Sequence, residues 1–180
     1  MMSKRHSYTD NLPSQMNKND FVACFGFVYE HSPWIAEIGW DRELTQKGNT
    51  EYDSAEKIHK VLRDVVNDAS RNRKLQLLQA HPDLAGELAV AGKITEESRA
   101  EQASADLANC TPEEFGAFQR LNTEYNKKFG FPFILAVRGY KRKEILEIFQ
   151  KRRHNDFETE FATALEQVHR IAYLRLKDIS

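Results

Sequence analysis

Long stretches of helix-forming residues, with little to interrupt them, constrain the fold of this chain more than any other feature. Its 180 residues include only 8 glycines and 5 prolines, and the segments between these are rich in alanine, leucine, glutamate, lysine, glutamine and arginine. These residue types favour helix over strand, and apolar positions recur at helical spacing. The sequence therefore predicts an all-α protein.

Several of the expected helices carry start signals. Ser54 caps a predicted helix that runs to about Ala69. Residues 111–114 have the form of a capping box, with proline at the first helical position. Residues 155–158 begin the last and longest helix in a similar way, and a further helix is expected over residues 20–30.

Size and composition predict a single compact multi-helix domain. The chain is 41% hydrophobic, enough to build a core, and it contains no internal repeat or low-complexity tract. The polar residues 1–18 are expected to be a flexible segment that precedes a domain over residues 19–180. They contain no apolar signal region, and no stretch approaches the ~20 apolar residues of a membrane span. We therefore expect a cytoplasmic protein with no membrane association.

Charge and cysteine usage exclude other classes. A net charge of -1, from 26 basic and 27 acidic residues, provides no attraction to nucleic acid. The basic cluster over residues 141–153 is interrupted by glutamates and is interpreted as a solvated helix face. Cys24, Cys110 and the six histidines have no disulfide or metal-ligand spacing, and nucleotide-binding motifs are absent. Neither a metal nor another cofactor is expected.

Chemistry is expected first in residues 80–86, the run AHPDLAG. Residues 71–79 have a helical pattern, and Pro82 disfavours α conformation in the residue before it, so this helix stops by His81. A helix carboxyl end favours the protonated imidazole by roughly 0.3–1 kcal/mol. His81 is then suited to act as both acid and base near neutral pH. The alternative is that Asp83 caps the next turn and His81 is a surface residue.

The last helix contains an arginine on its apolar stripe. That stripe ends at Arg175 and otherwise consists of Phe157, Phe161, Ala164, Val168 and Ile171. A buried guanidinium needs a counter-charge, so Arg175 is expected to meet a carboxylate of the protein or of a substrate. The alternatives are an ordinary structural ion pair or an arginine that reaches solvent at a frayed helix end.

Two further segments are candidates for binding a small polar ligand. Ser98, Glu101 and Gln102 share one face of a predicted helix, which is suited to a ligand rich in hydrogen bonds; the alternative is a solvated face. Residues 129–139, an apolar run fenced by glycines, are predicted to form a short extended segment that lines a pocket with its backbone amides. The alternative there is a buried helix that begins near Pro132.

Taken in order, five segments resemble the OHCU decarboxylases, which act on 2-oxo-4-hydroxy-4-carboxy-5-ureidoimidazoline (OHCU) in urate catabolism. The segments are Ser32-Pro33-Trp34-Ile35-Ala36, the run AHPDLAG over residues 80–86, Ser98 to Gln102, Phe131-Pro132-Phe133-Ile134, and Arg175-Leu176. The resemblance spans about residues 17–177. One departure is Asp106, in a stretch where the family commonly has Ala-Gly-Leu, and it affects the turn after the third segment.

The resemblance implies an all-α enzyme, usually a homodimer, that needs no cofactor and releases carbon dioxide to give (S)-allantoin. His81 matches the catalytic histidine of the family, and Glu101 matches its essential carboxylate. The positions that match substrate contacts are Pro82, Ser98, Arg99, Ala100, Glu101, Gln102, Phe133, Ile134, Leu135, Ala136, Val137 and Arg175. A small ureide is then the expected ligand.

Two functions from other classes compete with this interpretation. A helical binding module would hold a ureide such as allantoin through Arg175 and the Ser98 face, without turnover. A hydrolase of a related ureide would need a metal ion or an activated water. Release of carbon dioxide and insensitivity to chelators would separate a decarboxylase from a metal-dependent hydrolase.

Overall fold

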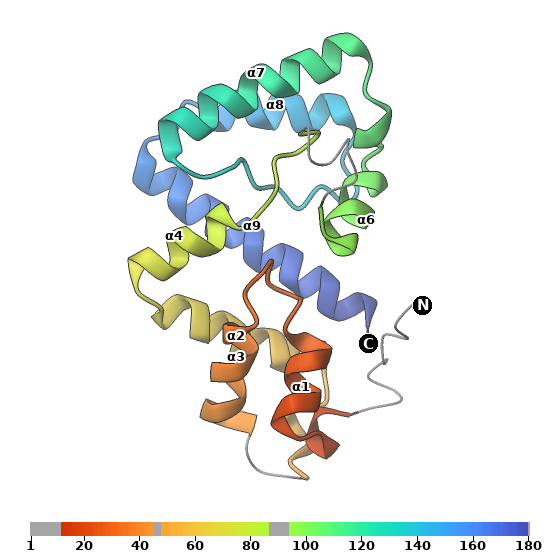
Figure 1. The fold of residues 1–180 in the computed structure, drawn as a ribbon, viewed down its shortest axis with the longest axis vertical. Helices are drawn as coiled ribbons and strands as arrows, with labels where there is room; N and C mark the ends of the chain where they lie inside the picture. Colours follow the sequence, from red (N-terminus) through yellow and green to blue (C-terminus); the bar gives the residue numbers. More distant parts are fainter. Residues whose placement is uncertain (1–11, 45–47, 87–93, 180) are drawn as a thin grey trace. The chain divides into compact units, whose positions relative to one another are not determined.

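The structure, a computed structural model, describes residues 12–44, 48–86 and 94–179, and every regular element in this part of the chain is helical (Figure 1). The α-helices are α1 (Lys18–Phe25), α2 (Trp34–Gly39), α3 (Ala55–Asp68), α4 (Arg71–Gln79), α6 (Glu96–Ser104), α7 (Pro112–Phe129), α8 (Arg142–Arg152) and α9 (Phe157–Asp178). Short turns of other helix types lie at η1 (Pro13–Gln15), η2 (Trp40–Leu44), η3 (Thr50–Tyr52) and η4 (Leu107–Asn109). The all-α class predicted from the sequence is confirmed.

The chain divides into two compact units. The first comprises the chain up to Leu77 together with the residues from His169 onward, and the second runs from Leu78 to Val168. Helices α4 and α9 therefore contribute residues to both units. Among the described residues, no helix combines the length and the apolar composition that crossing a bilayer requires.

The first unit is built around α3. Ser54 caps this helix by accepting a hydrogen bond from the Lys57 backbone N–H, as the sequence predicts. Its buried stripe is Ala55, Ile58, Val61, Leu62, Val65 and Val66. Helix α2 packs closely on this stripe, because a Cβ added at Gly39 would lie 3.0 Å from Leu62 Cδ2. The helix expected over residues 20–30 is shorter than predicted, since α1 ends at Phe25.

The amino-terminal stretch is partly described. Residues 1–11 of the predicted flexible segment lie outside the described residues. From Leu12 the chain is packed, because both the backbone N–H and the hydroxyl of Ser14 donate to the Asp53 carboxylate at 2.8 Å, and Met16 is buried. The domain boundary at residue 18 stays a prediction.

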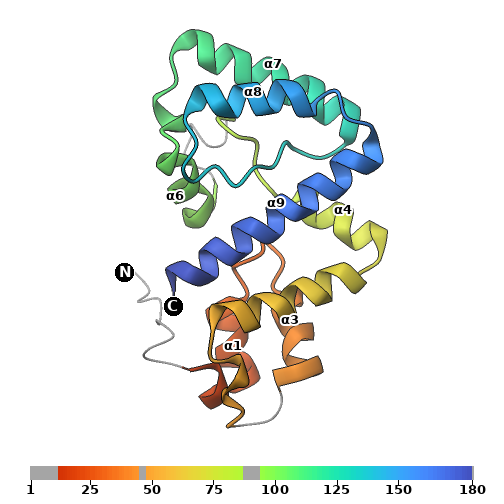
Figure 2. The same ribbon diagram turned by 180° about the vertical axis from the view of Figure 1, so that it is seen from behind.

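The second unit has α7 and α8 side by side (Figures 1 and 2). Thr111 and Glu114 form the predicted capping box at the start of α7. An aromatic cluster lies between these helices: the Tyr125 ring is 5.6 Å from Phe133 and 5.5 Å from Phe149, which stack on each other. The cluster anchors the segment that contains Phe133.

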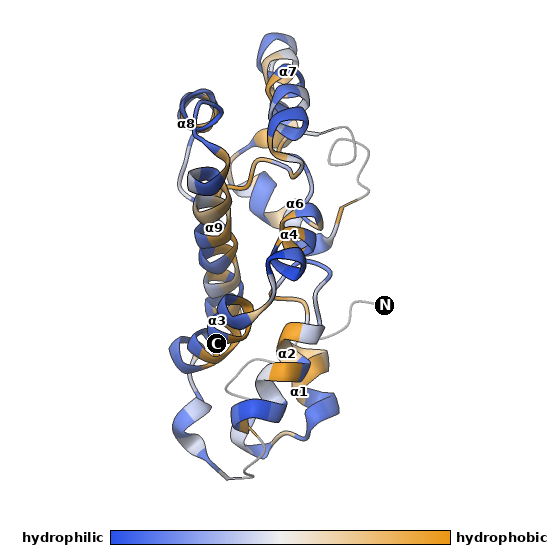
Figure 3. Cartoon of the chain, turned by 90° about the vertical axis from the view of Figure 1, so that its left-hand side faces the viewer, coloured by the Kyte–Doolittle hydropathy of each residue, from blue (hydrophilic) through white to orange (hydrophobic). Residues whose placement is uncertain are grey.

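That segment, residues 131–137, is entirely buried and forms neither helix nor strand. Of the segment predicted over residues 129–139, Phe129 belongs to α7, whereas residues 131–137 are non-helical as predicted, and the alternative of a helix beginning near Pro132 is excluded. Helix α9 follows after α8, and in Figure 3 apolar orange and polar blue alternate along it. Asp156 caps it by accepting a 2.9 Å hydrogen bond from the Thr159 backbone N–H.

Candidate active site

His81 lies directly after α4 in the second unit. The helix ends at Gln79, two residues earlier, and the His81 N–H still donates to the Leu78 carbonyl at 3.2 Å. The histidine is only 9% exposed, so it is not a surface residue. Gln79 donates to the Gly130 carbonyl at 2.8 Å and so connects the end of α4 to the start of the buried 131–137 segment.

The turn after His81 has an unusual backbone. Ala85 has φ of 48°, a left-handed conformation that a residue with a Cβ rarely adopts. Gly86 has no room for a side chain, because a Cβ there would lie 2.9 Å from the Asp83 Cβ. The residues at 84–86 are buried. This backbone conformation has to be held by contacts from outside the turn.

One of these contacts joins the turn to α6. Gln102 accepts a 3.0 Å hydrogen bond from the Ala85 N–H and donates to the Asp83 carbonyl at 3.2 Å. The side chain next to it in sequence is Glu101, which is half-buried. The candidate base and the candidate carboxylate thus belong to two segments that one glutamine connects.

The predicted polar face of α6 is packed rather than solvated. Thr95 caps the helix by accepting a hydrogen bond from the Ser98 N–H. Ser98 and Gln102 are buried, while Arg99 and Ala100 are exposed. Of the predicted contact residues in α6, the side chains of Arg99 and Ala100 therefore lie outside this buried face.

The backbone of the 131–137 segment is held on one side by two long side chains. Arg152 donates to the Ile134 carbonyl at 2.7 Å, and the Ala136 N–H donates to Gln167 at 3.1 Å. Leu135 lies between these two residues, and in the described part of the chain its N–H and carbonyl have no hydrogen-bond partner. Buried backbone groups are rarely left unpaired, so those of Leu135 are suited to a ligand.

Arg152 is a functional candidate that the sequence interpretation missed. We expected the basic cluster over residues 141–153 to be solvated, and for Arg152 this is wrong: the side chain is buried and pairs with Glu160, which is fully buried. Tyr125 donates to the same carboxylate. Burial, together with this hydrogen bond, raises the pKa of the Tyr125 phenol, which stays neutral.

Arg175 lies in the first unit, whereas His81 and Glu101 lie in the second. Its guanidinium donates to Glu30 at 2.8 Å and to the Phe27 carbonyl at 3.2 Å, and both charged side chains are buried. Arg175 therefore meets a carboxylate of the protein, which is also what the alternative of a structural ion pair requires, and a contact of Arg175 with a substrate stays a prediction. Its position on the apolar stripe indicated that Arg175 needs a carboxylate, but nothing in the sequence indicated that this carboxylate belongs to Glu30.

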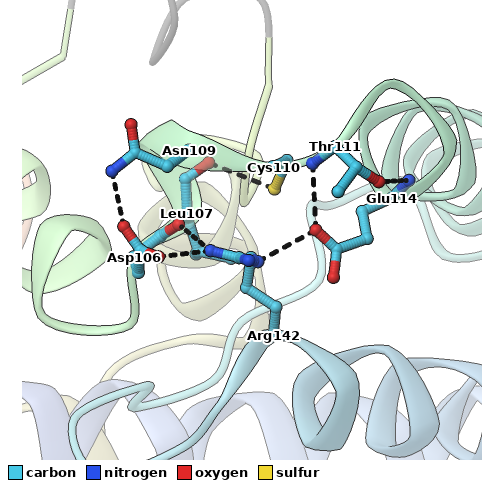
Figure 4. A network of polar contacts seen from close by, with 7 residues as sticks. All are labelled: Asp106, Leu107, Asn109, Cys110, Thr111, Glu114 and Arg142. Carbon is cyan, nitrogen blue, oxygen red and sulfur yellow. Dashed lines mark hydrogen bonds and ion pairs between the residues drawn. The ribbon is translucent and has the colours of Figure 1, made fainter.

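The turn at Asp106 keeps the conformation that glycine would favour. Asp106 has φ of 55° and ψ of 30°, in the left-handed region. Its carboxylate accepts hydrogen bonds from Asn109 and from Arg142, and Arg142 also pairs with Glu114 at 2.9 Å (Figure 4). Aspartate tolerates this region better than most residues, and the ion pair supports it.

The two cysteines are not activated nucleophiles. Burial raises the pKa of the Cys24 thiol to about 11, and burial together with the nearby Glu114 carboxylate raises the pKa of Cys110. A thiol needs a lowered pKa to attack a substrate at neutral pH. In the described residues, no group of three or more histidine, cysteine, aspartate or glutamate side chains is arranged to bind a metal ion.

Comparison with known proteins identifies relatives over almost the whole chain. A family model described as "OHCU decarboxylase" matches residues 14–177. The 2-oxo-4-hydroxy-4-carboxy-5-ureidoimidazoline decarboxylase of Haloferax volcanii is 39% identical over 173 residues, which is 96% of each chain. The protein of the same name from Halalkalicoccus jeotgali is also 39% identical, over 93% of this chain and 89% of its own.

A solved structure agrees with this match. The crystal structure of an (S)-allantoin synthase is 31% identical in sequence, with a TM-score of 0.73 over 96% of this chain. The present chain spans about half of the length of that protein, at 53%.

Proposed function

Because this chain belongs to the OHCU decarboxylase family, we propose that it decarboxylates OHCU to (S)-allantoin in urate degradation. The observation that carries the proposal is the Gln102 bridge, which joins the buried His81 turn to the helix that bears Glu101. A histidine and a carboxylate on two connected segments provide the two groups that the reaction requires for proton transfer.

The substrate supplies its own electron sink. The carbon that loses carbon dioxide also bears a hydroxyl group and adjoins an imine-like carbon of the ring. When the bond to the carboxylate breaks, its electron pair forms a double bond to that neighbouring carbon, and the imine pair moves onto the ring nitrogen, which takes up a proton. The product of this step is a neutral enol, so the reaction needs no cofactor.

The protein then has three tasks: to take the hydroxyl proton, to deliver a proton to one face of the neighbouring carbon, and to fix the orientation of the carboxylate. His81 takes or relays the hydroxyl proton. Glu101 positions or protonates the neighbouring carbon. Because the enol collapses to a ketone as that carbon is protonated, delivery from one face sets the handedness of the allantoin.

The remaining candidates bind the substrate. Gln102 holds its polar groups, and Pro82, Ser98 and Glu101 contact it from the His81 side. Backbone groups of Phe133 to Val137 bind the ureido and ring amides. The backbone of Leu135 supports this role, because its two flanking residues are engaged by Arg152 and Gln167 while its own polar groups are available.

The cellular setting follows from the same proposal. A small ureide is the partner, the enzyme works in the cytoplasm, and two copies form a homodimer. Nucleic acid and membranes take no part.

One assay tests the proposed function. OHCU is generated in the cuvette from urate with urate oxidase and hydroxyisourate hydrolase, and allantoin is followed by circular dichroism. The proposal predicts fast formation of one optical isomer, with carbon dioxide released and no effect of chelators. Binding of allantoin without any rate would instead indicate a ureide-binding module, and turnover without carbon dioxide would indicate a hydrolase.

A further inference from the structure

Three amide side chains of α7 bind the turn that follows His81. Gln119 donates to the Ala85 carbonyl at 2.9 Å, and Asn122 donates to the Leu84 carbonyl at 3.0 Å. Asn126 donates to the Asp83 carboxylate at 2.9 Å. Three consecutive residues of the turn thus each receive one hydrogen bond from this helix.

The order of these contacts is regular. Residues 119, 122 and 126 lie on one face of α7 at the i, i+3, i+7 spacing, and they contact residues 85, 84 and 83 respectively. The turn therefore runs antiparallel to the helix, with one amide for each of its residues. Gln102 of α6 binds the same turn through the Ala85 N–H and the Asp83 carbonyl.

Gln119 and Asn122 donate to the turn, and Asn126 donates both to the turn and to the Asn122 carbonyl of α7 at 3.0 Å. Asparagine is a poor helix former, and Asn122 is buried in the middle of α7. Its Oδ1 atom has no hydrogen-bond partner in the described part of the chain, which costs stability. The flip state of the amide is fixed, because only its nitrogen can donate to the Leu84 carbonyl. The hydrogen bond that Asn122 donates to the Leu84 carbonyl offsets part of this cost.

We propose that Gln119, Asn122 and Asn126 are positioning residues that hold the His81 imidazole in its reactive place. Gln119 and Asn122 fix the backbone of residues 84 and 85, and Asn126 fixes the side chain of Asp83. The turn needs such support because Ala85 is left-handed and the buried carbonyls have no helix or strand to pair with. Gln119 and Asn122 satisfy two of these carbonyls without adding a charge to the turn. Misplacement by about 1 Å lowers catalytic rates by about 100-fold, so the support acts on turnover.

The first test separates turnover from binding. Gln119→Met removes the donor and keeps the length of a half-buried side chain, and Gln150→Met makes the same change at an exposed position of α8. We expect kcat for OHCU to fall about 10- to 100-fold in Gln119→Met, with KM changed less than about threefold. Gln150→Met keeps wild-type values. Asn122→Leu provides a second, more buried variant, with folding of each variant checked by circular dichroism.

The second readout does not depend on activity, which matters because the positioning role rests on the proposed function. Imidazole ¹H–¹⁵N correlations of His81, assigned by their loss in His81→Asn, report the ring environment directly. The proposal predicts shifted or broadened His81 signals in folded Gln119→Met and unchanged signals in Gln150→Met. Wild-type kcat together with wild-type His81 signals in Gln119→Met would overturn it. An inactive wild type would refute the proposed function alone, and the signals would still decide the positioning role.

Discussion

The Nη2 atom of Arg175 lies 2.8 Å from Oε2 of Glu30, a residue 145 positions away in sequence, and the two side chains are only 4% and 1% exposed. A pair buried this deeply stabilises mainly because neither charge can be left alone. The Phe27 carbonyl accepts a second hydrogen bond from the same guanidinium. Glu30 therefore sets the direction in which Arg175 points.

Removal of one charge of this pair is expected to be costly. Glu30→Gln removes the carboxylate that pairs with the buried Arg175 guanidinium, and the free energy of unfolding should fall by about 3–5 kcal/mol. The double variant Glu30→Gln/Arg175→Met should regain much of this loss. Urea unfolding followed by circular dichroism measures the free energy of unfolding of the single and the double variant. A loss below about 1 kcal/mol in Glu30→Gln would show that the pair is not buried in solution.

Arg152 provides a test of the 131–137 segment. Arg152→Lys keeps a cation next to Glu160 but cannot also reach the Ile134 carbonyl. We expect a folded protein whose kcat falls about tenfold, because the backbone that we propose as a substrate-binding segment is loosened. The neighbouring exposed substitution Lys151→Arg is the control and should leave kcat unchanged. Equal rates for the two variants would separate Arg152 from the site.

The burial of His169 should make the free energy of unfolding sensitive to acid. Burial, with Arg63 nearby, lowers the pKa of this histidine from 6.5 to about 3. The unfolded chain therefore binds a proton at His169 that the native chain excludes. The stability that the neutral His169 contributes is complete above pH 6.5 and is lost as the pH falls toward 3. The slope from this residue reaches at most about 1.4 kcal/mol per pH unit.

The measurement is the free energy of unfolding between pH 7 and pH 5 in two histidine variants. His169→Gln should show a shallower slope than the wild type, although it is less stable at pH 7 because it loses the 2.8 Å contact with the Tyr29 hydroxyl. His154→Gln replaces an exposed histidine and should keep the wild-type slope. Identical slopes in His169→Gln and the wild type would refute the assignment.

The effect of a substitution at Asp106 on the melting temperature should depend on how well the new residue adopts the left-handed backbone conformation. Asp106→Gly removes the bond to Arg142 but relieves the left-handed backbone, so these two effects oppose each other and the melting temperature should change little. Asp106→Val loses the ion pair and places a β-branched residue where it is strongly disfavoured. Calorimetry should therefore show a clearly lower melting temperature for valine than for glycine. The reverse order would contradict the described turn.

Local signals in the sequence predicted much of the fold. Ser54, the Thr111 capping box and the start of α9 act through hydrogen bonds to residues only three positions away, so their effect is visible in a short window. The 131–137 segment was predicted as non-helical from its flanking glycines and its short length. In each case the determining contacts are close in sequence.

Partners that are distant in sequence could not be predicted. The apolar stripe of α9 showed that Arg175 needs a carboxylate, yet Glu30 was assigned to a helix that in fact ends at Phe25. Arg152 was interpreted as solvated because its basic neighbours are exposed, and only the fold brings it to Glu160. A pairwise contact leaves no periodic pattern in either segment.

The amide face of α7 did leave a signal. Gln119, Asn122 and Asn126 recur at helical spacing beside the buried Phe118 and Tyr125, and buried asparagine in a helix needs a partner outside it. We made no prediction from this spacing, which is the signal that could have indicated a buried polar contact. That the contact is the turn after His81 depends on how α7 packs, which only the structure reveals.

The most direct measurement of the central claim compares the wild type with His81→Ala in the coupled assay from urate. We predict rapid formation of one allantoin isomer with the wild type. For His81→Ala we predict only the slow racemic product of the uncatalysed reaction, with an unchanged far-ultraviolet circular dichroism spectrum. Near-normal, stereospecific turnover by a folded His81→Ala would contradict the assignment of His81 as the centre of the reaction.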